Sequence, residues 1–170
     1  MQLLWFLVGL LVVVVVNAAV PEGPRIEGSK RLTQTVDCNG AVVFSAVSTP
    51  ETTSPASSDK NQIINFDTSL IDKSVGFGRE SGIFTTHCPG LYQFTFTATG
   101  DASSRFSFRK RPSASTTAWK TIAVTNKTGG SHILFIDMEV GEQAAIFVDA
   151  GSLSPATSHS FSGYRVSKKL

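Results

Sequence analysis

The sequence predicts an all-β protein, folded as a β-sandwich or jelly roll. The first indication is composition, because the chain has 12 phenylalanines and many serines and threonines, while helix-favouring stretches are scarce. The second is the alternation of apolar and polar residues in short segments, most clearly from Leu91 to Thr97. The third is the set of turn signals, such as Pro89-Gly90, that separate these segments.

Residues 1–18 are expected to be a cleaved secretory signal peptide and not part of the fold. Leu3–Val16 is apolar apart from Gly9, a small residue follows at Ala18, and Pro21 would end a helix. The apolar stretch is shorter than the roughly 20 residues that a membrane-spanning helix needs. Because no Lys or Arg precedes it, an uncleaved N-terminal anchor is the alternative. Export would make the mature protein extracellular, with no membrane insertion after cleavage.

Residues 19–40 are expected to form a flexible leader, and residues 41–170 one globular domain. The leader is polar and contains prolines and glycines. It has neither the Gly-X-Y repeat of a collagen stalk nor the sustained heptads of a coiled coil. The remaining length is enough to bury a core.

Several segments of the domain have the alternation or the composition of a strand. They are Ala41–Val47, Ile63–Asp67, Gly82–Thr86, Leu91–Thr99, Arg105–Lys110, Trp119–Val124, Ser131–Met138, Gln143–Asp149 and His159–Val166. The first is followed by a Ser-, Thr- and Pro-rich loop that is too polar to be buried. Within Arg105–Lys110, Phe106 and Phe108 alternate with polar neighbours. Many short strands separated by turns indicate two packed sheets with apolar inner faces.

The charge of the chain argues against two classes of partner. Its formal net charge of +2 arises from 15 basic and 13 acidic side chains, and the two signs are interspersed. Neither nucleic acid nor an anionic membrane is therefore implied, since both attract blocks of positive charge.

No catalytic constellation is found, so the protein is not expected to be an enzyme. The histidines are His87, His132 and His159, and no GxSxG, HExxH, CxxC or glycine-rich phosphate loop accompanies them. Cys88 beside His87 could be a nucleophile and its base, but neighbouring residues of a strand point to opposite faces. Cys38 offers Cys88 a disulfide partner instead, since an exported chain meets an oxidising compartment.

Four blocks of sequence are informative together because of their order and spacing. They are Phe44-Ser45-Ala46; Phe66–Phe94, which includes Gly82-Ile83-Phe84 and Pro89-Gly90-Leu91-Tyr92-Gln93-Phe94; Met138–Glu142; and Phe161-Ser162-Gly163-Tyr164. This pattern resembles the globular-domain family of complement component C1q, over nearly all of residues 41–166. The chain departs from the family at Asp72, where Asn is usual, at Ser74, where Gly is usual, and across Ala102–Asn126, which matches poorly.

The resemblance implies a jelly-roll β-sandwich of about ten strands, of the tumour-necrosis-factor type, assembled as a compact homotrimer. The aromatic residues Tyr92, Phe94, Phe161 and Tyr164 would suit a trimer interface. The alternative is that they fill the core of a single subunit.

In the family's fold, the positions of Cys38 and Cys88 lie at the same end of the sandwich. The resemblance therefore implies an intrachain disulfide that ties the leader to the domain. The alternative is an interchain bond, because the leader lies where members of the family join trimers into larger assemblies.

Many members of the family hold calcium near the trimer axis through acidic side chains in loops. The corresponding loops here, Gly151–Ser160 and Asn126–Gly130, contain no Asp or Glu. Because calcium prefers several oxygens that include carboxylates, no metal and no other cofactor is expected. Asp149 and Asp101 are the remaining candidates for calcium.

Asn126-Lys127-Thr128 is an N-glycosylation sequon in a chain expected to be secreted. It lies between two expected strands and before two glycines, so exposure and glycosylation of Asn126 are expected.

A basic run, Arg105, Arg109, Lys110 and Arg111, is a candidate ligand patch. Such a cluster could attract sulfated glycans, sialic acid or bacterial surface phosphates. The alternative is a solvated strand edge, where positive charge discourages aggregation.

The resemblance and the signal peptide together predict a secreted, non-collagenous recognition protein. It would bind a carbohydrate, a microbial surface or a protein through loops at one end of a homotrimer, in innate immunity. The alternative is a trimeric signalling ligand of the tumour-necrosis-factor or adiponectin-like kind, which would bind a cell-surface receptor in the grooves between subunits. A structural component without a specific ligand is a third class.

Overall fold

The structure is a computed structural model of the chain, and it describes residues 38–48, 61–73, 76–112 and 118–169. The predicted signal peptide and most of the predicted leader lie outside these residues. Within the described ranges every regular element is a strand, and no helix is long and apolar enough to cross a membrane.

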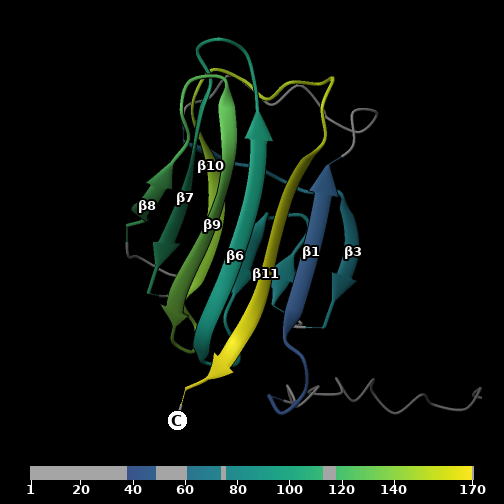
Figure 1. Cartoon of the computed structure of the whole chain (residues 1–170), viewed down its shortest axis with the longest axis vertical. Coiled ribbons are helices and arrows are strands. Elements are labelled where there is room, and N and C mark those ends of the chain that lie inside the picture. The colour runs from purple at the N-terminus through teal and green to yellow at the C-terminus, as the bar shows by residue number, and fades with distance from the viewer. Residues whose placement is uncertain (1–37, 49–60, 74–75, 113–117, 170) are drawn as a thin grey trace, which may run out of the picture. The chain divides into compact units, whose positions relative to one another are not determined.

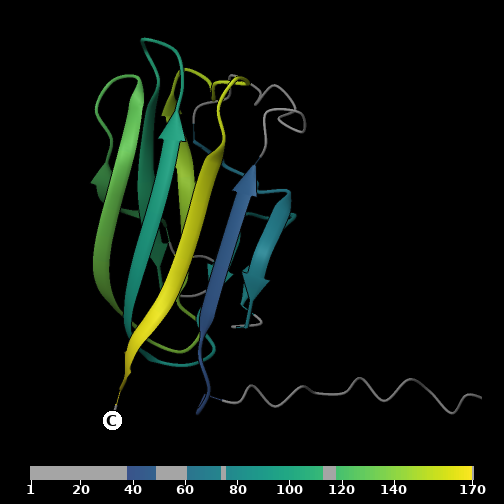
Figure 2. The same cartoon turned by 45° about the vertical axis from the view of Figure 1, so that its right-hand side comes forward.

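The described residues form two antiparallel sheets (Figures 1 and 2). The strands are β1 (Val43–Ser48), β2 (Gln62–Ile63), β3 (Thr68–Asp72), β4 (Phe77–Gly78), β5 (Ile83–Thr85), β6 (Gly90–Thr99), β7 (Arg105–Arg111), β8 (Lys120–Val124), β9 (Gly129–Met138), β10 (Gln143–Ala150) and β11 (His159–Lys168). The first sheet has the order β3-β1-β11-β6-β9 and crosses the front of Figure 1. The second has the order β4-β5-β10-β7-β8, with β2 paired to β10. The predicted all-β jelly-roll sandwich is confirmed, with β11 placed between β1 and β6 as such a crossover topology requires.

The segment between β1 and β5 differs from the prediction. The expected strand Ile63–Asp67 is wrong, because only its first residue belongs to a strand, and β3 and β4 follow unpredicted. Ile64 and Phe66 are buried while their neighbours Asn65 and Asp67 are exposed, so an irregular segment that packs into the core imitates the alternation of a strand. β3 is an edge strand with mostly exposed residues, which gives it no apolar alternation to detect.

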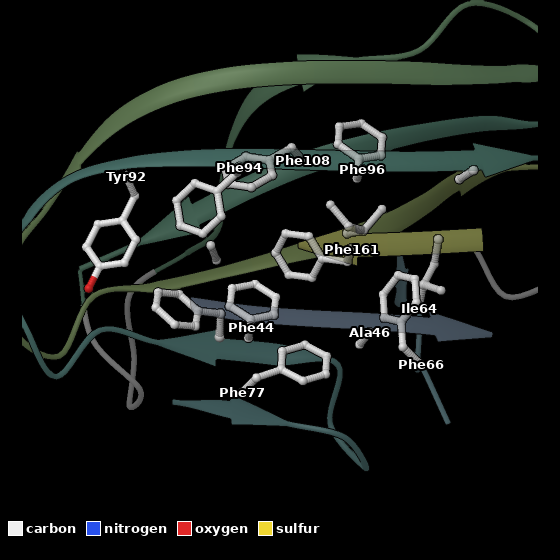
Figure 3. Close-up of a cluster of buried hydrophobic side chains, with 14 of the residues drawn as sticks. Phe44, Ala46, Ile64, Phe66, Phe77, Tyr92, Phe94, Phe96, Phe108 and Phe161 are labelled. Atoms are coloured by element: carbon white, nitrogen blue, oxygen red, sulfur yellow. The ribbon is translucent and has the colours of Figure 1, made fainter. Parts of the chain in front are cut away.

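The inner faces of the two sheets enclose a core built largely of phenylalanine (Figure 3). β6 alternates buried and half-buried residues over its whole length, as its sequence predicts. At its middle, Phe94 is fully buried, with its ring centroid 5.2 Å from that of Phe108, 5.6 Å from Phe84 and 6.1 Å from Phe161. Such pairs contribute about 0.5–1.5 kcal/mol each beyond the burial of their area.

Three of the four aromatic residues considered for a trimer interface belong to this core. Tyr92, Phe94 and Phe161 are at most 1% exposed, so the interface interpretation is wrong for them. Tyr164 is half-exposed on the other face of β11. Phe161 and Tyr164 are three residues apart in one strand and therefore point to opposite faces.

Gly163, in the same block, is required by the packing of the core. A Cβ at this position would lie 2.3 Å from a ring carbon of Phe44 and 2.9 Å from ring carbons of Phe94. The two rings therefore pack directly on the backbone of β11, a close approach that only glycine allows.

Candidate functional site

Side chains on the outer face of the first sheet form transverse rows across the strands. We call the surface made by three of these rows the uncharged face. The registers of the strands define these rows. They are Phe135, Gln93, Tyr164 and Val43; then Ile133, Thr95, Ser162 and Ser45; then Ser131, Thr97, Ser160 and Val47. None of these side chains carries a charge.

Large apolar side chains project from the uncharged face. Ile133 is 64% exposed, Phe135 61% and Tyr164 50%. Beside them, the hydroxyl groups of Ser45 and Ser162 bond to each other at 2.8 Å. The solvent face of an antiparallel sheet is usually polar and charged, whereas charge depletion and exposed aromatic residues are typical of the centre of a protein–protein interface. The uncharged face therefore has the properties of a surface that a protein covers.

Two cations of the basic run are already neutralised within the second sheet. Arg109 donates from Nη2 to Oδ1 of Asp149 at 2.5 Å and lies 4.3 Å above the ring of Phe147. Lys110 pairs with Glu142 at 2.7 Å. The positive charges of both side chains are therefore paired within the domain, and Arg109 also packs on an aromatic ring of β10.

The other two cations lie at opposite ends of β7. Arg105 is exposed at its beginning, and Arg111 stacks on Trp119 at its end, with the guanidinium 4.4 Å from the ring centroid. The structure therefore does not gather the four side chains into one cluster of free cations. Ligand binding by this run stays a prediction.

Three connecting segments meet at one end of the sandwich, at the top of Figure 1. We call residues 100–104, 125–128 and 151–158 the loop end. Hydrogen bonds join them; one runs from the Gly100 amide to the Thr128 carbonyl oxygen at 2.9 Å. Because the exposed residues here are mainly small and polar, the loop end can offer hydroxyl and amide groups to a ligand.

His159 anchors the last of these segments from inside the sandwich. The side chain is fully buried, its Nδ1 accepts from the Thr99 amide at 3.3 Å, and its Nε2 bonds the Ser154 carbonyl oxygen at 3.0 Å. Both bonds are satisfied when the neutral ring carries its proton on Nε2. Burial lowers the pKa of His159 below its ordinary value, against the opposing effect of the Ser154 bond.

We expect the stability of the domain to fall as the pH is lowered through about 6.5, the ordinary pKa of histidine. Folded His159 resists protonation, so below that pH the unfolded chain binds more protons and the free energy of unfolding falls by up to about 1.4 kcal/mol per pH unit. Urea unfolding at neutral and mildly acidic pH measures the effect. His159→Asn should flatten the pH dependence, and His87→Asn, at an exposed site, should not. Equal pH dependence in the wild type and His159→Asn would contradict this role.

Asn126, in the predicted sequon, is exposed in the hairpin between β8 and β9. Its carbonyl oxygen accepts a hydrogen bond from the Gly129 amide at 3.3 Å, which closes the turn and leaves the side chain outside. Glycosylation at this position stays a prediction.

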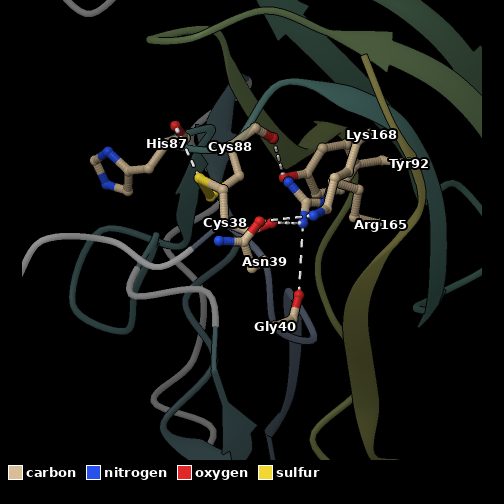
Figure 4. The surroundings of a disulfide bond; sticks show 8 residues. All are labelled: Cys38, Asn39, Gly40, His87, Cys88, Tyr92, Arg165 and Lys168. Carbon is tan, nitrogen blue, oxygen red and sulfur yellow. Dashed lines mark hydrogen bonds between the residues drawn. A yellow bond between two sulfur atoms is a disulfide. The ribbon is translucent and has the colours of Figure 1, made fainter. Parts of the chain in front are cut away.

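At the other end of the sandwich, Cys38 and Cys88 form a disulfide within the chain (Figure 4). Of the two pairings considered from the sequence, this is the intrachain one. It joins the last part of the leader to the turn before β6. Arg165 of β11 is buried beside it and donates to the carbonyl oxygens of Cys38 and Gly40. The Tyr92 hydroxyl donates to the Cys88 carbonyl oxygen at 2.6 Å, and burial raises the pKa of Tyr92 to about 12. Both cysteines are therefore held by side chains of the first sheet.

Replacing both Cys38 and Cys88 by serine is expected to lower the free energy of unfolding by about 2–4 kcal/mol, because the disulfide restricts the unfolded chain. Chemical unfolding of the double variant measures the loss. Lys168→Ala is the control, since its bond from Nζ to Asn39 Oδ1 at 2.9 Å holds the same segment from an exposed position. We expect that change to cost less than about 1 kcal/mol. On a non-reducing gel the wild type should run as a single chain without free thiol, and a covalent dimer would contradict the pairing.

The described residues contain no group of three or more His, Cys, Asp or Glu that could hold a metal. Asp101 and Asp149, the two candidates for calcium, are held by their neighbours. Asp101 accepts hydrogen bonds from the Ser103 amide and hydroxyl, which lower its pKa below the usual range. Asp149 accepts from Arg109. These donor sets do not fit calcium, which needs several oxygen ligands around one point.

Residues 43–166 match the family model of the C1q domain. The chain belongs to the C1q domain family. The match extends from the start of β1 nearly to the end of β11, so the whole sandwich is a C1q domain. Domains of this family are ligand-binding and typically extracellular. No curated protein sequence matches the chain.

Solved structures with this fold include both complement and tumour-necrosis-factor proteins. The globular domain of zebrafish complement 1qA is 19% identical, with a TM-score of 0.58 over 76% of this chain and 100% of that one. The structure of Eiger TNF from S. frugiperda is 11% identical, with a TM-score of 0.53 over 76% and 95%. Murine APRIL is 10% identical, with a TM-score of 0.55 over 75% and 100%. At such identities these likenesses establish the shared fold.

Ile133 and Phe135 were not predicted as functional residues, although the chain carries a signal for them. They lie in a run of four consecutive apolar residues, Ile133–Ile136, in an edge strand of an antiparallel sheet. A strand with one wet face alternates apolar and polar residues, and a continuous apolar run indicates that both faces are covered.

Proposed function

We propose that the protein is a secreted C1q-domain recognition protein, which binds a carbohydrate, a microbial surface or a protein ligand as a homotrimer in innate immunity. The observation that carries the proposal is the uncharged face, with its exposed Ile133, Phe135 and Tyr164. It supports association of the domain with copies of itself, and the family resemblance implies three copies.

Association through the uncharged face supports recognition in a simple way. The face lies on the side of the first sheet, and the loop end lies at the tips of the strands. Copies that pack along their sheets would therefore present their loop ends together on one side of the assembly. Several weak contacts to a repetitive glycan or microbial surface then combine into strong binding, because each later contact is intramolecular.

A glycan array and a panel of bacterial surfaces, probed with the purified secreted protein, test this function. We expect binding to a defined set of saccharides or cells, with loss of avidity when the assembly is dissociated. Absence of binding to all of them, together with capture of one cell-surface receptor in a pull-down, would contradict it.

That second outcome would support the alternative, a trimeric signalling ligand of the tumour-necrosis-factor or adiponectin-like kind. The observation that favours it is the similarity of the fold to Eiger TNF and APRIL. In this alternative the receptor would occupy grooves between subunits, so variants at the loop end would leave its binding unchanged.

A further inference from the structure

A shallow pocket of about 310 Å³ opens on the second sheet, beside β5. Thr85, His87 and Gln143 line it together with small and apolar residues in and beside β4 and β5. None of its lining side chains is acidic. The volume lies at the lower end of the range for small-molecule sites, which begins near roughly 300 Å³.

A hydrogen-bonded row of side chains borders this pocket. The register places Thr85, Gln143 and Arg111 side by side on β5, β10 and β7. Arg111 donates from Nε to Gln143 Oε1 at 2.8 Å, and Gln143 donates from Nε2 to Thr85 Oγ1 at 3.0 Å. Gln143 is only 7% exposed, so its amide is held in one orientation. The row therefore holds the guanidinium beside Gln143, one of the residues that line the pocket.

The charge of Arg111 has no acidic partner among the described residues, unlike that of Arg109 or Lys110. One face of its guanidinium stacks on Trp119 and its Nε is bonded to Gln143, while the terminal amino groups have no partner in the part of the chain that the structure describes. Thr85 Oγ1 already accepts a bond, so its hydroxyl proton is available to a ligand. A held guanidinium with free terminal groups matches the two oxygens of an oxyanion.

We propose that this pocket binds the oxyanion group of an acidic saccharide, a carboxylate or a sulfate, with Arg111 as its anchor. The proposal rests on the proposed recognition function and names the ligand class, and it places a saccharide site on the second sheet, apart from the loop end. Hydroxyl, amide and imidazole groups line the pocket beside apolar Phe77 and Ile83, a mixture that suits the polar edges and apolar faces of a sugar ring. Its open shape suits the terminal unit of a glycan chain.

Binding of lactose, sialyllactose and sulfated lactose to the full secreted protein tests the proposal by calorimetry. We expect one of the two charged sugars to bind at least about tenfold more tightly than lactose, the effect of a charge-assisted hydrogen-bond pair. Preference for sialyllactose would identify a carboxylate as the source of the oxyanion, and preference for sulfated lactose a sulfate.

Two variants of Arg111 and one control locate the site. Arg111→Gln removes the charge and Arg111→Lys keeps it without the planar fork, so the preference should vanish in the first and fall in the second. Lys73→Gln, an exposed cation that follows β3 in the other sheet, should leave affinity within about twofold, as expected of a distant site. Thermal unfolding confirms that each variant is folded.

Other outcomes separate this inference from the proposed function. If the wild type binds glycans with no preference for charge, or with a preference that Arg111→Gln retains, the pocket proposal is overturned while recognition stands. If it binds neither a saccharide on the array nor a bacterial surface, and a cell-surface receptor is captured instead, both are overturned.

Discussion

Replacing Ile133 and Phe135 together by glutamate will convert the assembled protein into single, folded subunits. Both side chains project from the uncharged face and are mostly exposed in the subunit, so the change should alter the stability of the subunit itself by less than about 1 kcal/mol. In an assembly the same carboxylates would be buried without partners, at a cost of several kcal/mol each. Sedimentation of the double variant measures its mass, and circular dichroism confirms its sheet content.

The control for this prediction is Val140→Glu. Val140 is 65% exposed in the turn between β9 and β10, away from the uncharged face, so this variant should assemble like the wild type. An Ile133→Glu/Phe135→Glu variant that keeps the mass of the wild type would show that another surface joins the copies.

Phe94→Ala is expected to cause the largest loss of stability of any single substitution discussed here, about 3–5 kcal/mol. Phe94 is fully buried and its ring contacts aromatic rings from both sheets, so its removal leaves a cavity that the rigid rings cannot close. Because domains are stable by only about 5–15 kcal/mol, much of the total would be lost. Urea unfolding at fixed protein concentration measures the difference.

Leu70→Ala is the matched control, since Leu70 is a large apolar residue that is 65% exposed on β3. Its loss should change the free energy of unfolding by less than about 0.5 kcal/mol. A cost for Phe94→Ala no greater than that of Leu70→Ala would mean that the two sheets do not close over this residue as described.

The fold could be predicted because its strongest signals lie in central strands. β6 is buried on one face along its whole length, and the alternation of Tyr92, Phe94 and Phe96 with polar residues follows directly. The turns are marked by glycine and proline, and the block around Gly163 reflects a real steric requirement of the core. Edge strand β3 shows neither apolar alternation nor a residue required by the core, because most of its side chains are exposed to solvent.

The surfaces could be predicted only in part, since they depend on which residues meet across strands. The basic run is contiguous in sequence, but Arg109 and Lys110 find acidic partners on β10 and in the turn before it, and no local pattern reveals these pairs. Likewise, the row of Thr85, Gln143 and Arg111 joins residues from three strands. The pairing of Cys38 with Cys88 could be predicted, because the family resemblance placed both cysteines at the same end of the sandwich.

The uncharged face and the candidate pocket lie on different sheets, so assembly and ligand binding can be tested separately. The double glutamate variant should keep the intrinsic affinity of each pocket for a small charged sugar, while losing avidity for a surface that displays many copies. Arg111→Gln should lose the preference for the charged sugar while it keeps the mass of the wild-type assembly.

The mass of the mature wild-type protein in solution tests the central claim most directly. Sedimentation equilibrium of the wild-type chain, purified without the predicted signal peptide, is predicted to give three times the mass of a single chain at its physiological concentration. A mass equal to one chain under those conditions would contradict the account, because the uncharged face would then be exposed to water without a partner.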